Sequence, residues 1–248
     1  MRWYKTDLHI HTVLSPCGGL EMSPKNLIKR AKEVGLEIIA ITDHNSMANC
    51  EVYQNEAEKH GITCFWGVEI QTSEEIHIIA IFDSKLKAKE FDVELYESLL
   101  PIKNNPDFFG DQVVIDNEEN IIRFEPKALI NSSVWTLDEV VAKLEEYDCL
   151  FYPAHIDAET YSIIGQLGFI PSNLKFPTLG ITAQCDCDKF LSKYPYLKGF
   201  SFNRSSDAHY LEELGTGFTD YFLEAPTLKD IRLACQKKSL INYDIKKK

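Results

Sequence analysis

The sequence predicts one α/β domain in which strands and helices alternate to form a distorted barrel. The chain has 248 residues, a length typical of one large α/β domain. Short apolar runs alternate with helical segments along it, and most of its seven histidines come directly after an apolar run. Because (βα) barrels place their active sites at the carboxyl ends of their strands, this pattern favours a barrel. An open, doubly wound sheet is the alternative.

The expected strands are short apolar runs without the polar alternation of a half-exposed strand. Such runs are typical of parallel strands that are buried on both faces. They lie at residues 8–10, 37–42, 62–68, 76–82, 149–152, 179–182 and 197–202.

Capping residues mark the expected helices. Ser23 precedes a proline at the first helical position, which predicts a helix that ends at the next glycine. Thr136 begins a capping box for a helix over 137–147, and Thr227 can cap a last helix over about 228–237.

One stretch, residues 100–133, interrupts this alternation. Within it, residues 113–115 and 121–124 flank an Asp-Asn-Glu-Glu-Asn turn and predict a hairpin. A long insert in a compact domain is usually a lid or a binding loop. A hairpin without a role in the site is the equal alternative.

The charge balance bears on the expected partners. The chain carries 26 basic and 38 acidic residues, for a net charge of −12. Non-specific binding of a nucleic-acid backbone needs a basic surface, so a nucleic-acid polymer is not expected as a partner. Metal cations can supply positive charge locally, which leaves a small phosphorylated substrate open.

Cysteine usage and hydropathy indicate the compartment. No run of about 18 apolar residues occurs, so we expect no transmembrane helix and no membrane partner. The seven cysteines are odd in number and irregularly spaced, which favours reduced thiols and a cytoplasmic protein.

The main functional signal is a set of imidazoles and carboxylates near strand ends. His9 and His11 are two residues apart on an expected strand, so their side chains project from the same face and can bind one cation. Without cations, such a buried cluster would be costly, and both residue types are ligands of zinc, manganese and iron. The other members are His44, Glu69, His77, His155, Asp207 and His209. Their number exceeds what one tetrahedral ion uses and favours a multinuclear site with a bridging carboxylate.

Five motifs, taken in order, resemble those of the PHP superfamily, named for its polymerase and histidinol phosphatase members. They are Asp-Leu-His-Ile-His-Thr at 7–12, Thr-Asp-His-Asn at 42–45, Gly-Val-Glu at 67–69, Pro-Ala-His at 153–155 and Ser-Asp-Ala-His at 206–209. The resemblance implies a distorted (βα)7 TIM-like barrel over 1–248, with the insert at about 100–133, and a trinuclear metal centre.

The resemblance also implies how the ligands are shared among three divalent ions per chain. The first ion would use His9, His11, Glu69 and Asp207; the second Glu69, His77 and His155; the third His44, His209 and a residue of the loop after His11. Family members usually carry His or Asp in that loop.

In this chain the loop has Pro16, which cannot bind metal, and Cys17. We expect Cys17 to be the ligand, which favours zinc or iron and leaves manganese possible. The alternative is that Cys17 is a bystander.

Residues beside the ligands suggest further roles. Asp7 and Asp43 could orient the imidazoles, or simply be polar strand ends. Arg204 and Ser206 are the expected substrate contacts, because an arginine fork can hold a phosphate; a surface ion pair is the equal alternative for Arg204.

The leading functional expectation is a metal-dependent phosphoesterase that acts on a small phosphorylated metabolite or nucleotide. Asp207 and His209 are the candidates for general-acid catalysis. Two alternatives are a non-catalytic or regulatory metal-binding module and a metal-dependent amidohydrolase. Amidohydrolases typically use a bridging lysine on a middle strand, and the later strand runs offer none before Lys198.

Overall fold

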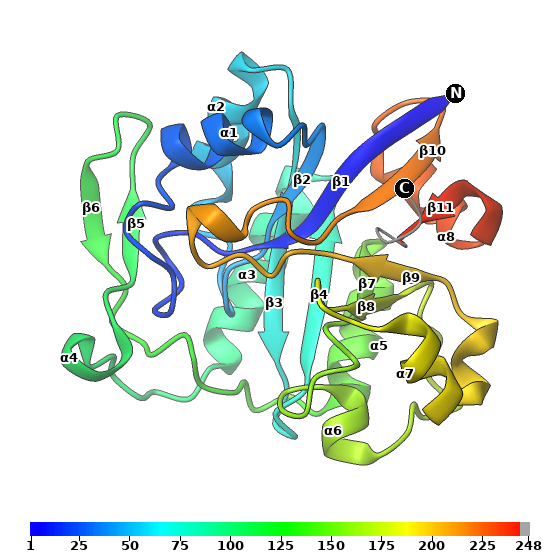
Figure 1. Ribbon diagram of the computed structural model, residues 1–248. Helices are drawn as coiled ribbons and strands as arrows, with labels where there is room; N and C mark the ends of the chain where they lie inside the picture. The colour runs from blue at the N-terminus through cyan, green and yellow to red at the C-terminus, as the bar shows by residue number, and fades with distance from the viewer. Residues whose placement is uncertain (244–248) are drawn as a thin grey trace.

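The strands curl into a distorted barrel in the computed structural model, which describes residues 1–243 (Figure 1). The strands are β1 Arg2–Ile10, β2 Ile38–Ile41, β3 Thr63–Gln71, β4 His77–Phe82, β5 Val113–Ile115, β6 Ile121–Phe124, β7 Leu150–Pro153, β8 Leu179–Ile181, β9 Phe202–Arg204, β10 Thr219–Leu223 and β11 Ile241–Asn242. The main sheet has the order β11-β10-β1-β2-β3-β4-β7, and β8 pairs with β9 in a second, parallel sheet.

Backbone hydrogen bonds just beyond the strand ends close the ring between the two sheets. The Ile156 N–H donates to Gly180 O next to β7, and the Asp207 N–H donates to His9 O on β1. The close approach of β8 to β7 needs the glycine, since a Cβ at Gly180 would lie 2.9 Å from Pro153 O. This closure confirms the distorted barrel over the open sheet.

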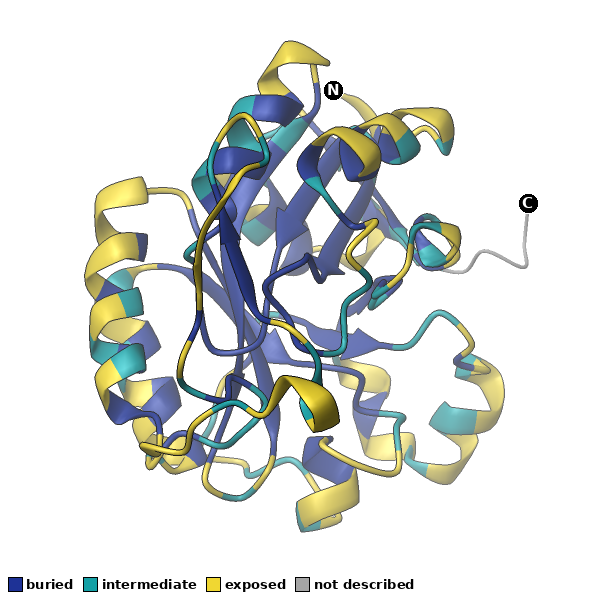
Figure 2. Cartoon of the chain, turned by 90° about the vertical axis from the view of Figure 1, so that its left-hand side faces the viewer, coloured by how far each residue is buried: buried dark blue, intermediate teal, exposed yellow. Residues whose placement is uncertain are grey.

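The longer helices cover the outside of the sheet, each with one buried face, as the dark inner and yellow outer faces in Figure 2 show. The Thr136 capping box is present: its hydroxyl accepts the Glu139 N–H, and the Glu139 carboxylate accepts the Thr136 N–H. The helices are α1 Pro24–Glu33, α2 Cys50–Lys59, α3 Lys85–Ser98, α4 Pro106–Phe109, α5 Leu137–Tyr147, α6 Ile163–Leu167, α7 Cys187–Lys193 and α8 Leu228–Cys235, with 3-10 turns η1 Pro195–Gly199, η2 Leu211–Glu213 and η3 Lys238–Leu240.

The strand directions correct the expectation of an all-parallel barrel. β4 runs antiparallel to both β3 and β7, and β10, which no apolar run predicted, runs antiparallel to β1. A run buried on both faces looks the same in either direction, so periodicity could not show this. The strand expected over 197–202 is wrong as well: Pro195–Gly199 is a 3-10 turn that proline starts, and β9 begins only at Phe202.

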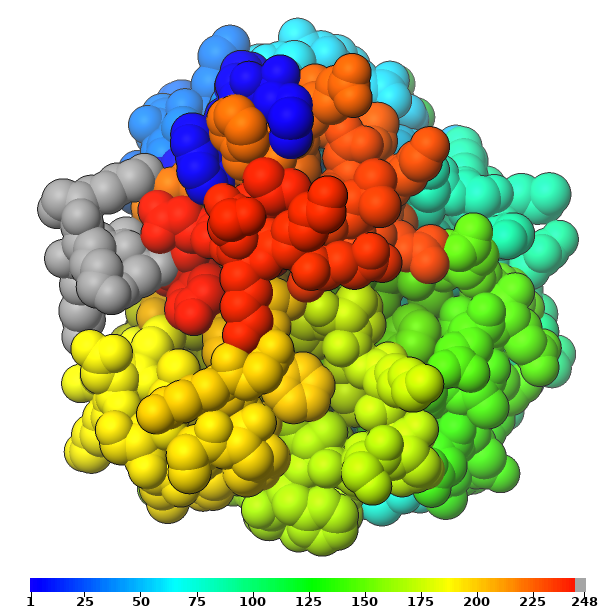
Figure 3. Space-filling model, turned by 90° about the vertical axis from the view of Figure 1, so that its right-hand side faces the viewer, coloured from blue at the N-terminus to red at the C-terminus, as the bar shows by residue number. Residues whose placement is uncertain are grey.

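The barrel interior is closed at the end opposite the strands' carboxyl ends. Leu228 and Ile231 of α8 belong to the same buried cluster as Leu8, Ala40 and Phe65 of the inner strand faces. Figure 3 views this side, where α8 lies in red over the surrounding segments. A site inside the barrel therefore opens at the carboxyl ends of the parallel strands.

The insert forms the predicted hairpin with the predicted bounds, at the left edge of Figure 1. Asn49 attaches the hairpin to the barrel, since its amide donates to Val113 O and its carbonyl accepts the Ile115 N–H. Gln112 is buried and bonds to the backbone of residues 125, 127 and 129. Among the described residues, no helix is long and apolar enough to cross a membrane.

Candidate metal centre

The barrel brings the eight candidate ligands to one end. His9 and Glu69 lie near the ends of strands β1 and β3, and His77 is the first residue of β4. Because β4 runs antiparallel to β3, its first residue lies beside Gln71, the last residue of β3. The remaining candidates follow β1, β2, β7 and β9; they are His11, His44, His155, Asp207 and His209.

A first group of four side chains surrounds a point beside β1. The Nε2 atoms of His9 and His11 lie 3.1 Å apart, and each lies 3.1 Å from Asp207 Oδ1. The same two nitrogens lie 3.2 and 3.3 Å from the Glu69 oxygens. Ligands at about 2.0–2.1 Å from a tetrahedral ion lie roughly 3.3 Å apart, so these spacings fit a first-row metal ion.

Glu69 also belongs to a second group. Its Oε1 lies 2.9 Å from His77 Nδ1 and 3.2 Å from His155 Nε2, and its Oε2 lies 3.0 Å from His44 Nδ1. A third group consists of His11, His44 and His209, with the rings of His11 and His209 stacked at 4.1 Å. Glu69 is thus shared by the first and second groups.

Unpartnered nitrogens support the fit of these groups to cations. His44 Nδ1 is fully buried and has no hydrogen bond, although it lies 3.0 Å from a Glu69 oxygen. A buried polar atom without a partner is destabilising. A cation between His44 and Glu69 would satisfy both, so the donor set suits metal ions.

The charges within the cluster set the protonation of the ligands. Burial raises the pKa of Glu69, but the charges of His77, His9 and His44 outweigh it and hold that pKa well below its ordinary value. Burial, followed by the charge of His11, lowers the pKa of His44 to about 4 and that of His209 to about 3. These two imidazoles are therefore neutral at pH 7, as metal binding requires.

A hydroxyl that the sequence reasoning missed orients His11. The Ser15 hydroxyl donates to Asp43 Oδ1 at 2.6 Å, so its oxygen accepts the Nδ1–H of His11 at 2.9 Å. It also accepts the His44 N–H at 3.2 Å. Asp43 further accepts the N–H and the hydroxyl of Thr12, both at 2.7 Å. Asp43 thus acts on the ligand through Ser15, and His11 Nε2 faces the first group.

Gln71 and Asp7 also form hydrogen bonds that position candidate ligands. Gln71 Oε1 lies 3.0 Å from His77 Nε2, which directs His77 Nδ1 toward Glu69. Asp7 accepts the N–H of Ser206 at 3.1 Å and that of His9 at 3.4 Å, so it ties the segment before Asp207 to β1. Burial raises the pKa of Asp7 to about 7. No spacing in the sequence singled out Gln71 or Ser15, because their partners meet them only in the fold.

Cys17 is not brought into any of the three groups, among the residues that the structure describes. Burial raises the pKa of its thiol to about 11, so the sulfur is protonated at neutral pH. Its role as a third-site ligand stays a prediction, which the geometry does not favour.

The two expected substrate contacts point elsewhere and need correction. Arg204 is only 4% exposed, and its guanidinium donates to the carbonyl oxygens of Thr182, Ala183, Cys185 and Tyr243. Because these bonds occupy the fork, Arg204 holds loop backbone together and offers no phosphate clamp. The Ser206 hydroxyl is likewise fully buried, so a substrate cannot reach it.

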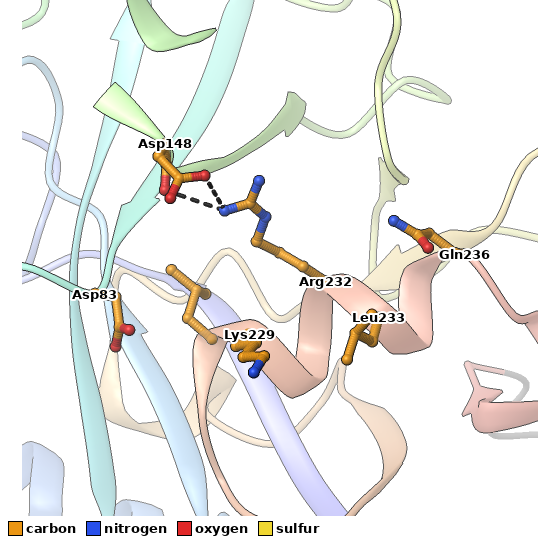
Figure 4. Close-up of a pocket in the computed structure, with 7 residues that line it drawn as sticks. Asp83, Asp148, Lys229, Arg232, Leu233 and Gln236 are labelled. Atoms are coloured by element: carbon orange, nitrogen blue, oxygen red, sulfur yellow. Dashed lines mark hydrogen bonds and ion pairs between the residues drawn. The ribbon is translucent and has the colours of Figure 1, made fainter. Parts of the chain in front are cut away.

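A cavity of about 270 Å³ opens beside the cluster. It is lined by six candidate ligands, namely His44, Glu69, His77, His155, Asp207 and His209, and by Gln71, Ile130, Ala158, Thr160, Tyr161 and Thr182. A second hollow of about 380 Å³ lies against α8, where Arg232 pairs with Asp148 at 2.6 Å (Figure 4). None of the candidate ligands lines that hollow.

The chain is similar to parts of several known proteins. A 5'-3' exoribonuclease of Haemophilus influenzae is 35% identical over 88 residues, which are 34% of this chain and 31% of the relative. Among solved structures, the lesion-specific endonuclease EndoQ of Pyrococcus furiosus matches with a TM-score of 0.69 at 20% identity, over 94% of this chain and 56% of that one. Endonuclease Q in complex with a duplex that carries an abasic lesion matches with a TM-score of 0.72 at 19% identity, over 97% and 58%. The chain thus spans less than two thirds of these relatives.

These relatives overturn the expectation that a nucleic-acid polymer is an unlikely partner. Both the exoribonuclease and the endonuclease act on nucleic acids by their names, and one structure holds a DNA duplex. The net charge of −12 describes the whole chain. It does not describe the field at the phosphate, where bound cations would be the largest local charges.

The model of the PHP domain matches residues 7–147, which is more than half of the chain. This segment contains His9, His11, His44, Glu69 and His77, which the fold brings together. The chain belongs to the PHP domain family.

Proposed function

We propose that the chain is a metal-dependent phosphoesterase that hydrolyses phosphodiester bonds in nucleic acid. One observation carries the proposal: five imidazole nitrogens lie within 3.3 Å of the two oxygens of Glu69, next to an open cavity. Metal ions held there would bind phosphate oxygens and lower the pKa of a water molecule.

The protein's own residues would bind the ions and order the site. Glu69 is 1% exposed and lies where a bridging ligand is needed. The Asp207 side chain is 34% exposed, so this carboxylate can meet both an ion and a substrate on the cavity wall. Although burial raises the pKa of Asp207, the His9 charge and the His11 hydrogen bond hold it below its ordinary value. The carboxylate form that these contacts favour is the form of Asp207 that binds a cation.

The choice of nucleic acid as the substrate class rests on the named relatives and on the size of the cavity. A cavity of about 270 Å³ is near the lower end of ligand pockets, roughly 300–1,000 Å³, and suits one nucleotide rather than a long duplex segment. The acidic surface implies few phosphate contacts outside the cavity. We therefore expect cleavage near a strand end or at an unpaired nucleotide, with a shallow dependence of affinity on salt.

The test is hydrolysis by protein that has been stripped with a chelator and reloaded with zinc, iron or manganese. The substrates are single-stranded RNA and DNA oligonucleotides, a duplex with an abasic site, and the phosphate diester and monoester of p-nitrophenol. Glu69→Gln removes the bridging charge, while Glu56→Gln, on α2 and paired with Lys59, is the matched control.

The parent and Glu56→Gln should cleave a phosphodiester, and Glu69→Gln should lose activity by about 100-fold or more, beyond the loss from an outer residue. Failure of every phosphoester with every metal would overturn the proposal in favour of a non-catalytic metal module. Cleavage of amides instead would favour an amidohydrolase.

A further inference from the structure

Tyr161 is an aromatic side chain that is presented in the cavity and fixed to a candidate metal ligand. Its ring stacks on the ring of His77, with centroids 4.9 Å apart and planes at 16°. Its carbonyl oxygen accepts the His77 N–H at 2.9 Å. The residue is nevertheless 43% exposed and lines the cavity. One ring face is thus covered by His77 while much of the residue meets solvent.

The loop before α6 holds Tyr161 rigidly. Tyr161 has a φ of 55°, a left-handed conformation that is unfavourable for a bulky side chain unless its surroundings impose it. The next residue, Ser162, caps α6 through the Gly165 N–H and donates to Ala158 O at 2.7 Å. A Cβ at Gly165 would lie 2.4 Å from Glu159 O, so this loop packs on α6 only because of that glycine.

The cavity has two kinds of lining. Candidate ligands such as Glu69 and His155 line it, and so do the apolar side chains of Ile130 and Ala158 and the aromatic residue Tyr161. Ile130 is the contribution of the insert: the Asn45 amide donates to the carbonyl oxygens of Leu129 and Asn131, both at 2.9 Å. Since Asn45 directly follows His44, the end of the insert is fastened beside the metal centre.

A ligand with an anionic group and a flat apolar group matches this lining: the anionic group can lie beside the candidate ligands, and the flat group beside Tyr161 and Ile130. We propose that Tyr161, with Ile130, forms a nucleobase subsite, in which a base of the substrate stacks on the ring face of Tyr161 that His77 does not cover. This inference rests on the proposed function and specifies that the enzyme recognises a base as well as a phosphate. Every base has a π face, so the subsite would accept all four bases.

The test compares Tyr161→Phe, which keeps the ring, with Tyr161→Leu, which keeps an apolar cover on His77 without an aromatic face. Tyr196→Ala is the matched control, because Tyr196 is 49% exposed but belongs to the η1 turn. One readout is the fluorescence of oligonucleotides that contain 2-aminopurine, which stacking quenches. The other readouts are kcat and KM on a dinucleotide and on an analogue without bases, with the metal content of each variant measured.

Tyr161→Leu should abolish the quenching and weaken binding of the dinucleotide by about 5- to 150-fold, as loss of one stacked base does. The analogue without bases should be unaffected, and Tyr161→Phe and Tyr196→Ala should match the parent. Equal quenching and KM in Tyr161→Leu and the parent would overturn the inference. So would a fall in metal content that accounts for the whole effect, because Tyr161 would then only support His77.

The fluorescence arm separates this inference from the proposed function. If the parent cleaves phosphodiesters but Tyr161→Leu changes nothing, the subsite is wrong and the phosphoesterase stands. If the parent cleaves nothing but quenches 2-aminopurine in a Tyr161-dependent way, the subsite stands and the enzymatic proposal fails.

Discussion

Ser15→Ala is the perturbation that most directly probes how the chain prepares its metal ligands. The hydroxyl bridges Asp43 and His11, at 2.6 and 2.9 Å, and accepts the His44 N–H. Its removal frees the His11 ring to rotate or to exchange the nitrogen that carries the proton. It also leaves the His44 N–H without this acceptor.

The expected loss follows from what Ser15 touches. Residues behind a metal ligand typically contribute about 10- to 100-fold in metal affinity, or roughly 1.4–2.8 kcal/mol. Because His11 belongs to two of the three groups, more than one ion should be weakened. A buried group left unpaired adds about 1–3 kcal/mol of lost folding stability.

The assay is equilibrium competition for zinc with a chromophoric chelator, together with urea unfolding of the metal-free protein. Ser98→Ala is the matched control, since Ser98 is a buried serine that donates only to Leu95 O at the end of α3. Ser98→Ala should keep the parent's zinc affinity. A zinc affinity of Ser15→Ala within twofold of the parent would refute the role of the hydroxyl in holding His11.

Three other substitutions test separate parts of the structure. The Asp92 carboxyl accepts the Met47 N–H, and burial raises its pKa to about 6. The folding stability that comes from the protonated form of Asp92 is therefore lost as the pH rises from 3.8 through about 6. Asp92→Asn should therefore gain stability over the parent at about pH 7 and little at about pH 4 in urea titrations of metal-free protein; an equal gain at both would contradict this. Cys17→Ala should leave the metal content unchanged by mass spectrometry, because the sulfur belongs to none of the three groups; loss of one ion per chain would restore Cys17 as a ligand. Thr136→Ala should lower the free energy of unfolding by about 1 kcal/mol through loss of the cap on Glu139, and an unchanged urea midpoint would show that α5 does not need it.

Local chemistry made parts of the fold predictable. The Thr136 capping box predicts the start of α5, and the turn at 116–120 predicts the hairpin between β5 and β6 with its observed bounds. Strand direction and the edge strand β10 were not predictable, because they depend on pairing between distant segments. The mixed polar and apolar residues of β10 gave no continuous apolar run.

The candidate site was predictable where chemistry and position coincide. Imidazoles and carboxylates near strand ends, such as His9 and Glu69, can be recognised in the sequence because such groups are rare in a core and destabilising there. Ser15 and Tyr161 could not be found, because a serine or a tyrosine is ordinary in a loop until the fold gives it a partner. The prediction for Arg204 was wrong for the opposite reason. An arginine near a metal ligand suggests a phosphate contact, but the guanidinium of Arg204 donates to backbone carbonyl oxygens.

We propose above all that Glu69 bridges a centre of more than one metal ion. The most direct test is the metal content per chain, by plasma mass spectrometry with sulfur as the internal count, for parent and Glu69→Gln after loading with zinc and removal of the excess. We expect more than one tightly held ion in the parent, up to one for each of the three groups, and loss of more than one ion in Glu69→Gln. One ion or fewer in the parent, or the same content in both proteins, would contradict it.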